Sequence, residues 1–223
     1  MGARVGAVHT GFFGGIISST ATTAALAKRS HRAAASQDVT REALTFLAAT
    51  IAMHIAGIAI LLFVADDVQP QLLIVFIGPI LVAGLIILLN SKKQTQAKHE
   101  LESNRFDLLP IARLSAFIIA ILVVSKLLQN IFGHSRLIVL TFLVSLFEVR
   151  GSFIAAIQLQ DVGTIDVRMQ GSLIALSITA SYFSKLFLIH SIGNAKLKTQ
   201  ARKYTLYLSL SLLCSWFTFW SVG

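Results

Sequence analysis

The sequence predicts an all-α protein, a polytopic bundle of about seven transmembrane helices. Of its 223 residues, 55% are hydrophobic and 13% are charged, whereas an ordinary soluble domain carries about 25% charged residues. The apolar residues come in runs of about 20, which is the length of a membrane-spanning helix. A membrane β-barrel would instead show alternating segments about half as long. The length fits one integral-membrane domain over residues 1–223.

Each predicted span is an apolar stretch bounded by polar residues. The stretches cover residues 5–27, 44–65, 72–89, 108–128, 137–157, 173–192 and 204–222. The first is the least apolar, because it contains several glycines and a run of hydroxyl residues. The fifth is interrupted by Glu148-Val149-Arg150-Gly151. We predict a broken helix at each of these two places, and a polar cytoplasmic linker over residues 91–107.

The formal charge of +9 is carried mostly by short segments between apolar stretches. Such segments are typical of cytoplasmic loops that face anionic lipid, so we expect a lipid bilayer rather than nucleic acid as the partner. If every predicted span crosses the membrane, the segments on its inner side hold nine Lys and Arg residues and the segments on its outer side hold six. This count predicts a membrane protein with its N-terminus outside and its C-terminus inside.

Two further features limit what the chain does. Ala25-Leu26-Ala27 resembles a signal-peptidase site, but the glycine- and hydroxyl-rich run before it is unlike a signal sequence, so we expect this segment to be retained. The one cysteine, Cys214, has no partner for a disulfide and no neighbours at metal-ligand spacing. Because no catalytic or nucleotide-binding motif is present, we predict no enzyme and no cofactor.

Ionisable residues inside predicted spans are the first functional candidates, because charge is costly at bilayer depth. Glu148 and Arg150 lie deep in the fifth stretch, where they either serve a polar path or neutralise each other at a helix contact. Lys185 is near the middle of its span, and Glu148 is the only acid inside another predicted span that could pair with it. We interpret His54 as a satisfied interior histidine. Arg113 and Lys126 lie nearer span ends and can snorkel.

The hydroxyl run Ser18-Ser19-Thr20-Ala21-Thr22-Thr23 follows a Gly-Gly pair. Small and hydroxyl residues let membrane helices pack closely, and hydroxyl and carbonyl oxygens also coordinate partly dehydrated ions. The run therefore predicts either a helix-packing face or part of a transport path.

The segment over residues 11–30, GFFGGIISSTATTAALAKRS, resembles the hallmark G-GG-SSTATT-ALA-RS of a bacterial membrane family. This family is a multi-spanning domain of unknown function that is found C-terminal to MgtC/SapB membrane proteins. Weaker matches follow in order: NRFDL from residue 104, SKLLQ from 125, EVRG from 148, and Ser181 to Lys185 in place of the family's N-T-x-x-K. The resemblance implies a membrane bundle in the bacterial inner (plasma) membrane, a link to magnesium, and a partner that is either the protein itself or an MgtC-type domain.

This sequence departs from the family pattern at two of these positions. Arg150 stands where the family has a second acid, and Ser181 where it has Asn. Because an adjacent cation weakens the field of the Glu148 carboxylate, a two-carboxylate cation site is not expected here. The candidate path residues are therefore Ser18, Ser19, Thr20, Thr22, Thr23, Glu148, Arg150, Ser181 and Lys185.

An internal comparison suggests a duplication. Aligning Ser18 with Glu148 places a polar stretch and two spans after each motif, which gives repeat halves over residues 1–90 and 104–223. We expect parallel repeats whose motif helices face each other. The function predicted is transport of an ion or small solute. The alternative is a non-transporting protein that binds or regulates another membrane protein through its small-residue helix face.

Overall fold

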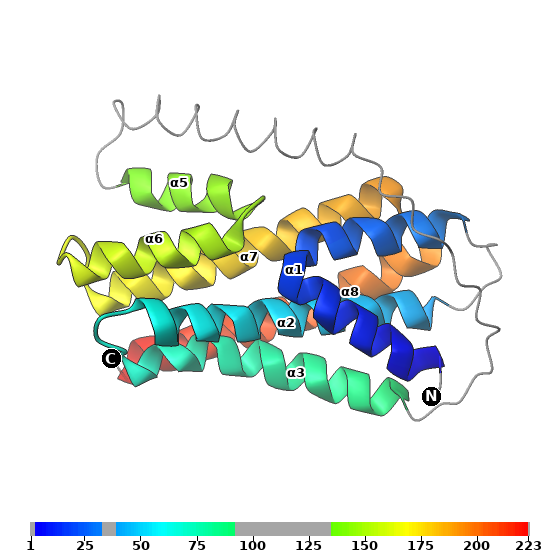
Figure 1. Ribbon diagram of the computed structural model, residues 1–223, viewed down its shortest axis with the longest axis horizontal. Helices are drawn as coiled ribbons and strands as arrows, with labels where there is room; N and C mark the ends of the chain where they lie inside the picture. The colour runs from blue at the N-terminus through cyan, green and yellow to red at the C-terminus, as the bar shows by residue number, and fades with distance from the viewer. Residues whose placement is uncertain (1–2, 33–38, 92–134, 223) are drawn as a thin grey trace.

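A computed structural model describes residues 3–32, 39–91 and 135–222, and the regular structure in these ranges is entirely helical. The elements are α1 (Ala3–Arg32), α2 (Thr40–Val64), the 3₁₀ turn η1 (Pro70–Leu73), α3 (Ile74–Ser91), α5 (Ser135–Ser145), α6 (Val149–Asp161), α7 (Val167–Ile192) and α8 (Ala195–Val222) (Figure 1). The predicted all-α bundle is confirmed. The predicted span at 108–128 and the linker at 92–107 lie outside the described residues.

Four segments of the described chain are long and apolar enough to cross a membrane. They are Thr40–Val64, Pro70–Asn90, Val167–Ile192 and Ala195–Val222. Their outer faces carry exposed apolar side chains, such as Leu81 and Leu85 on α3 and Leu213 and Phe217 on α8. Because water would penalise such surfaces and lipid would not, these helices indicate a membrane protein.

The first predicted span is a hairpin instead of one crossing, and we call α1 the N-terminal hairpin. Near its start, the Ala7 carbonyl accepts a hydrogen bond from Thr45 Oγ1 (3.2 Å), and near its end, Arg29 pairs with Glu42 (3.1 Å). A straight helix would separate Ala7 from Arg29 by about 33 Å, yet both reach the first turns of α2. The chain turns at Ser18, whose φ of −159° and ψ of 108° are extended.

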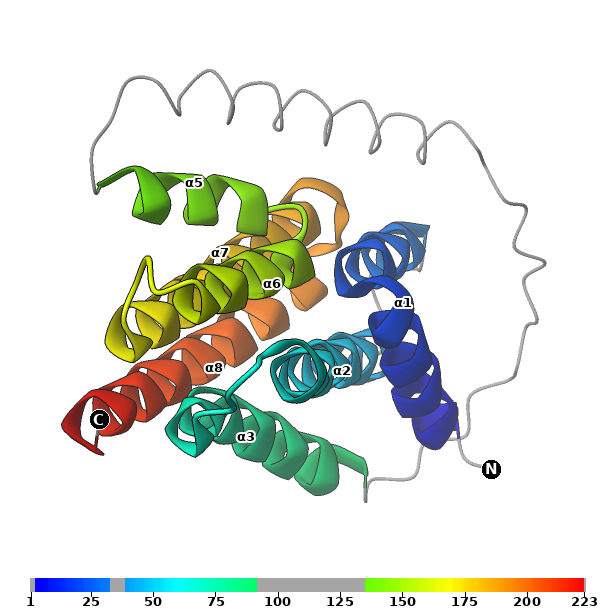
Figure 2. The same cartoon turned by 60° about the vertical axis from the view of Figure 1, so that its left-hand side comes forward.

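The fifth predicted span is also a hairpin, formed by α5 and α6, and we call it the C-terminal hairpin. Ser145 Oγ donates to Ser152 Oγ at 2.7 Å, whereas the rise between residues seven apart on one helix is about 10 Å. The chain turns over residues 146–148 (Figures 1 and 2). Hydropathy predicted a crossing at both places because two short apolar helices folded together have the composition of one long helix.

The two halves of the bundle run in opposite directions. In the first half α2 and α3 follow the N-terminal hairpin, and in the second half α7 and α8 follow the C-terminal hairpin. Each hairpin packs on both α2 and α7, and α3 packs along α8. Figure 1 shows α2 and α7 running antiparallel, and α3 and α8 likewise. The expectation of parallel repeats is therefore wrong, and the arrangement is that of an inverted repeat. The duplication itself remains a hypothesis.

The two ends of the bundle differ sharply in charge. Asn194, between α7 and α8, donates to the Ser30 carbonyl (2.9 Å), so the ends of α1 and α7 and the starts of α2 and α8 lie together. This basic end carries Lys28, Arg29, Arg32, Arg41, Lys196, Lys198, Arg202 and Lys203, with Glu42. The acidic end, where Arg168 lies 5.4 Å from the Trp220 ring centroid, carries Asp66, Asp67, Asp161 and Asp166 together with that arginine.

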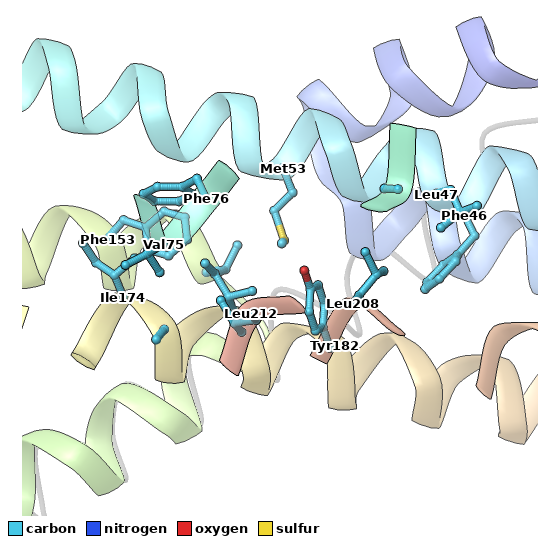
Figure 3. Close-up of a cluster of buried hydrophobic side chains, with 14 of the residues drawn as sticks. Phe46, Leu47, Met53, Val75, Phe76, Phe153, Ile174, Tyr182, Leu208 and Leu212 are labelled. Carbon is cyan, nitrogen blue, oxygen red and sulfur yellow. The ribbon is translucent and has the colours of Figure 1, made fainter. Parts of the chain in front are cut away.

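An aromatic and aliphatic core joins the halves (Figure 3). Phe76 of α3 and Phe153 of α6 meet edge to face, with ring centroids 5.7 Å apart. Both rings lie against Gly57 of α2, where an added Cβ would come within 2.7 Å of them. The C-terminal hairpin is thus anchored in the hydrophobic interior rather than on its surface.

Candidate functional site at the hairpin tips

The turns of the two hairpins meet through Arg150, which is half-buried. Its guanidinium donates to the carbonyls of Gly15 (3.0 Å), Ile17 (3.3 Å) and Ile16. These are the last carbonyls before the break at Ser18, and a helix leaves such groups without intrahelical partners. The negative end of the helix dipole also stabilises a cation at this point. Arg150, in the first turn of α6, therefore caps the first half of α1.

Ser18 and Glu148 hold matching positions in their hairpins. Ser18 Oγ accepts from the Ala21 amide (3.2 Å) at the start of the second half of α1. Glu148 is the N-cap of α6, and its Oε1 accepts from the Arg150 amide (3.1 Å). Both side chains satisfy amides that the helix start leaves free. The residues that the sequence alignment pairs thus begin the second helix of each hairpin.

Glu148 and Arg150 do not neutralise each other in the described structure. The hydrogen bond between them uses the Arg150 amide, and the one side-chain ion pair within the described ranges joins Arg29 to Glu42. Glu148 is exposed, and no hydrogen bond among the described residues links it to the hydroxyl run. The contact between the two motifs is made by Arg150 instead.

A buried polar layer lies between α2 and α7, beside the tips. The Met53 thioether accepts from Lys185 Nζ (3.1 Å) and from Ser181 Oγ (3.2 Å). His54 Nε2 and Tyr182 Oη are 2.9 Å apart, and His54 Nδ1 is 2.7 Å from the Thr50 carbonyl. The histidine is thus hydrogen-bonded on both nitrogens, as expected of a satisfied interior histidine. Lys185 is 0% exposed.

The hydroxyl run divides into bonded and unbonded side chains. Thr23 is fully buried and donates to the Ser19 carbonyl (2.8 Å). By contrast, the hydroxyls of Ser19, Thr20 and Thr22 make no hydrogen bond within the described ranges. Thr22 lies against Gly14, where an added Cβ would be 2.7 Å from its hydroxyl oxygen. The run therefore contributes both to hairpin packing and to a set of unused donors at the tip.

The fold and the tips define the class, a helical membrane protein with two broken-helix hairpins set between crossing helices. Over residues 1–193 the chain matches the family described as "Domain of unknown function (DUF4010)". The chain belongs to this family. The match carries no link to MgtC/SapB proteins, so that part of the resemblance remains a prediction. No curated protein and no solved structure matches the chain.

Several residues of the site were missed at the sequence level. Met53 and Tyr182 are common interior residues of apolar helices, and neither type signals a site when it stands alone. The carbonyls of Gly15, Ile16 and Ile17 have no sequence signature beyond the Gly-Gly pair before the break. The available signal for this contact was Arg150, a basic residue at a position where the family pattern has an acid. That signal indicated a change of charge and did not indicate helix capping.

Proposed function

We propose that the protein transports a small solute across the membrane, with the solute path at the meeting point of the two hairpin tips. The observation that carries this proposal is the contact of Arg150 with the carbonyls of Gly15, Ile16 and Ile17. Irregular backbone at membrane depth is tolerated where it is buried in protein or lines a polar cavity. Paired discontinuous helices in inverted repeats are a feature of secondary transporters.

The inverted arrangement supports alternating access. Two halves that run oppositely can exchange conformations, so that a site between them faces one side and then the other. Here each hairpin packs on α2 of the first half and on α7 of the second half. Rocking of one half would move both tips relative to α2 and α7, while the site itself stays between them.

Charge favours a solute other than a metal cation. The tips carry Arg150, and Lys185 lies buried on α7; among the described residues no carboxylate forms an ion pair with either. Among the described residues no group of three or more His, Cys, Asp or Glu could hold a metal ion. The magnesium link that the family resemblance implies therefore finds no support in the residues around the tips.

We also infer that the basic end faces the cytoplasm. Of the Lys and Arg residues whose side chains the structure describes, eight lie at the basic end and one at the acidic end, and cytoplasmic segments carry the excess of such residues. This places the N-terminal hairpin's two ends inside and the end of α8 outside. The inference reverses the predicted positions of both termini, because the earlier count treated each hairpin as a crossing.

Glu148→Gln tests the transport proposal. The glutamine keeps an oxygen that can cap α6 but removes the charge exposed at the tip, so we expect flux to fall several-fold while folded yield stays near that of the wild type. Purified protein in liposomes on a solid-supported membrane would be challenged with small charged solutes, and the transient currents recorded.

Asp67→Asn is the matched control, because it also neutralises an exposed acid, but one at the acidic end of the bundle. It should leave the currents unchanged. Absence of solute-driven current in folded wild-type protein, across the whole panel of solutes, would argue for the non-transporting alternative.

A further inference from the structure

Lys185 is a buried amine whose described surroundings provide no counter-charge. Its side chain is 0% exposed, and its hydrogen bond goes to the Met53 sulfur at 3.1 Å. A thioether is a weak acceptor. No carboxylate of the described chain lies within ion-pair distance of the ammonium, since the one pair there is Arg29 with Glu42. A buried unpaired charge is costly, so such a group indicates a partner outside the described residues.

The titratable and charged groups that face Lys185 are cationic or neutral. On α6 lies Arg150, which is a cation, and on α2 lies His54, which is hydrogen-bonded on both ring nitrogens. Tyr182, one turn before it on α7, is hydrogen-bonded to His54. The nearest acid of the tips, Glu148, is exposed and engaged as the cap of α6. Among the described residues, the surroundings of Lys185 therefore provide no negative charge to pair with it.

The hairpins add hydrogen-bond donors that also suit a negatively charged ligand. The second half of α1 and all of α6 begin at the tips, where helix dipoles present their positive ends. Ser19, Thr20 and Thr22, in the first turns after the break in α1, have hydroxyls without partners in the described ranges. The N-terminal hairpin packs on α7, which carries Lys185. Cationic groups and unused hydroxyl donors thus come from neighbouring elements.

We propose that Lys185, with Arg150 and the hydroxyls of the α1 tip, forms a binding site for a small oxyanion, the carboxylate or phosphate group of the transported solute. This proposal rests on the transport function and names its substrate class. The ammonium supplies the buried charge, and the guanidinium keeps nitrogen donors at the tip while it caps α1. Ser181, which shares the Met53 sulfur with Lys185, lies one turn before it on α7 and places another hydroxyl beside the site.

The test is thermal unfolding of the purified protein in detergent, with inorganic phosphate or succinate and with chloride at matched ionic strength. We expect both oxyanions, but not chloride, to raise the melting temperature in a saturable way. Lys185→Met should weaken the apparent affinity about tenfold or more. Without oxyanion it should melt no lower than the wild type, because it removes an unpaired buried charge. Lys203→Met, at an exposed position of the basic end, should respond like the wild type.

A second measurement does not depend on how well the Lys185 variant folds. Thr20→Cys, made with Cys214→Ala, would be alkylated with and without phosphate, and we expect phosphate to slow the reaction several-fold. Three results would overturn the proposal: no response of the wild type to either oxyanion, an unchanged response in Lys185→Met, or stabilisation only by phosphatidylglycerol in nanodiscs. Both experiments measure oxyanion binding without measuring transport. A failure of the oxyanion site can therefore be distinguished from a failure of the transport proposal.

Discussion

Arg150→Met is expected to destabilise the protein strongly, by roughly 2–4 kcal/mol, and to abolish transport. The guanidinium donates to three consecutive carbonyl groups at the end of the first half of α1. Methionine keeps an unbranched stem but is shorter and donates nothing, so those carbonyls lose their partner, and lipid offers no other donor. The measurement is the midpoint of unfolding in detergent.

Two variants calibrate this result. Arg150→Lys should fall between the wild type and Arg150→Met, because an ammonium keeps the charge but cannot match the planar fork of a guanidinium. Arg202→Met removes an exposed arginine of the basic end and should cost little. If Arg150→Met and Arg202→Met had the same unfolding midpoint, the contact between the tips would make no contribution to stability.

Gly15→Ala carries the second large effect, about 1–3 kcal/mol of destabilisation. The N-terminal hairpin packs closely on α2, and a Cβ on Gly15 would stand 2.6 Å from the Ala49 Cα and 2.7 Å from its carbonyl oxygen. Gly11, one turn earlier, meets Thr45 in the same way. Backbone atoms cannot yield as a flexible side chain does, so the hairpin must shift away from α2.

Gly84→Ala is the control for that experiment. Gly84 is also a helical glycine, in α3, but a Cβ there has no atom within 4 Å. Alanine has the higher helix propensity, so this variant should be neutral or slightly stabilising. The difference in unfolding midpoint between the two variants measures the close approach alone. Equal midpoints would contradict the packing of α1 on α2.

Hydropathy was sufficient to predict the fold class and the position of each apolar segment that lies within the described residues. The breaks were also predictable, since a Gly-Gly pair with a hydroxyl run and the Glu148-to-Gly151 interruption both stand out. Hydropathy could not distinguish a crossing from a hairpin, because it measures composition along the chain and not direction in space. This affected the predicted topology, because counting the two hairpins as crossings placed basic segments on both sides of the membrane.

The candidate site was predicted only in part, because a single sequence does not show which helices are neighbours. Ser18 and Glu148 could be aligned because each starts a polar motif, and the structure places them at equivalent helix starts. That Arg150 would reach the carbonyls before Ser18, and that Lys185 would lie on Met53, depends on which helices are neighbours. Such contacts between residues more than 130 positions apart leave no local pattern in a single sequence.

Cysteine labelling tests the two-hairpin architecture most directly. Val5→Cys, Arg32→Cys and Thr164→Cys, each with Cys214→Ala, would be exposed to a membrane-impermeant maleimide from either face of sealed vesicles. We expect Val5→Cys and Arg32→Cys, at the two ends of α1, to react only from the cytoplasmic face, and Thr164→Cys only from the opposite face. Reaction of Val5→Cys and Arg32→Cys from opposite faces would show that α1 crosses the membrane, and would contradict the account.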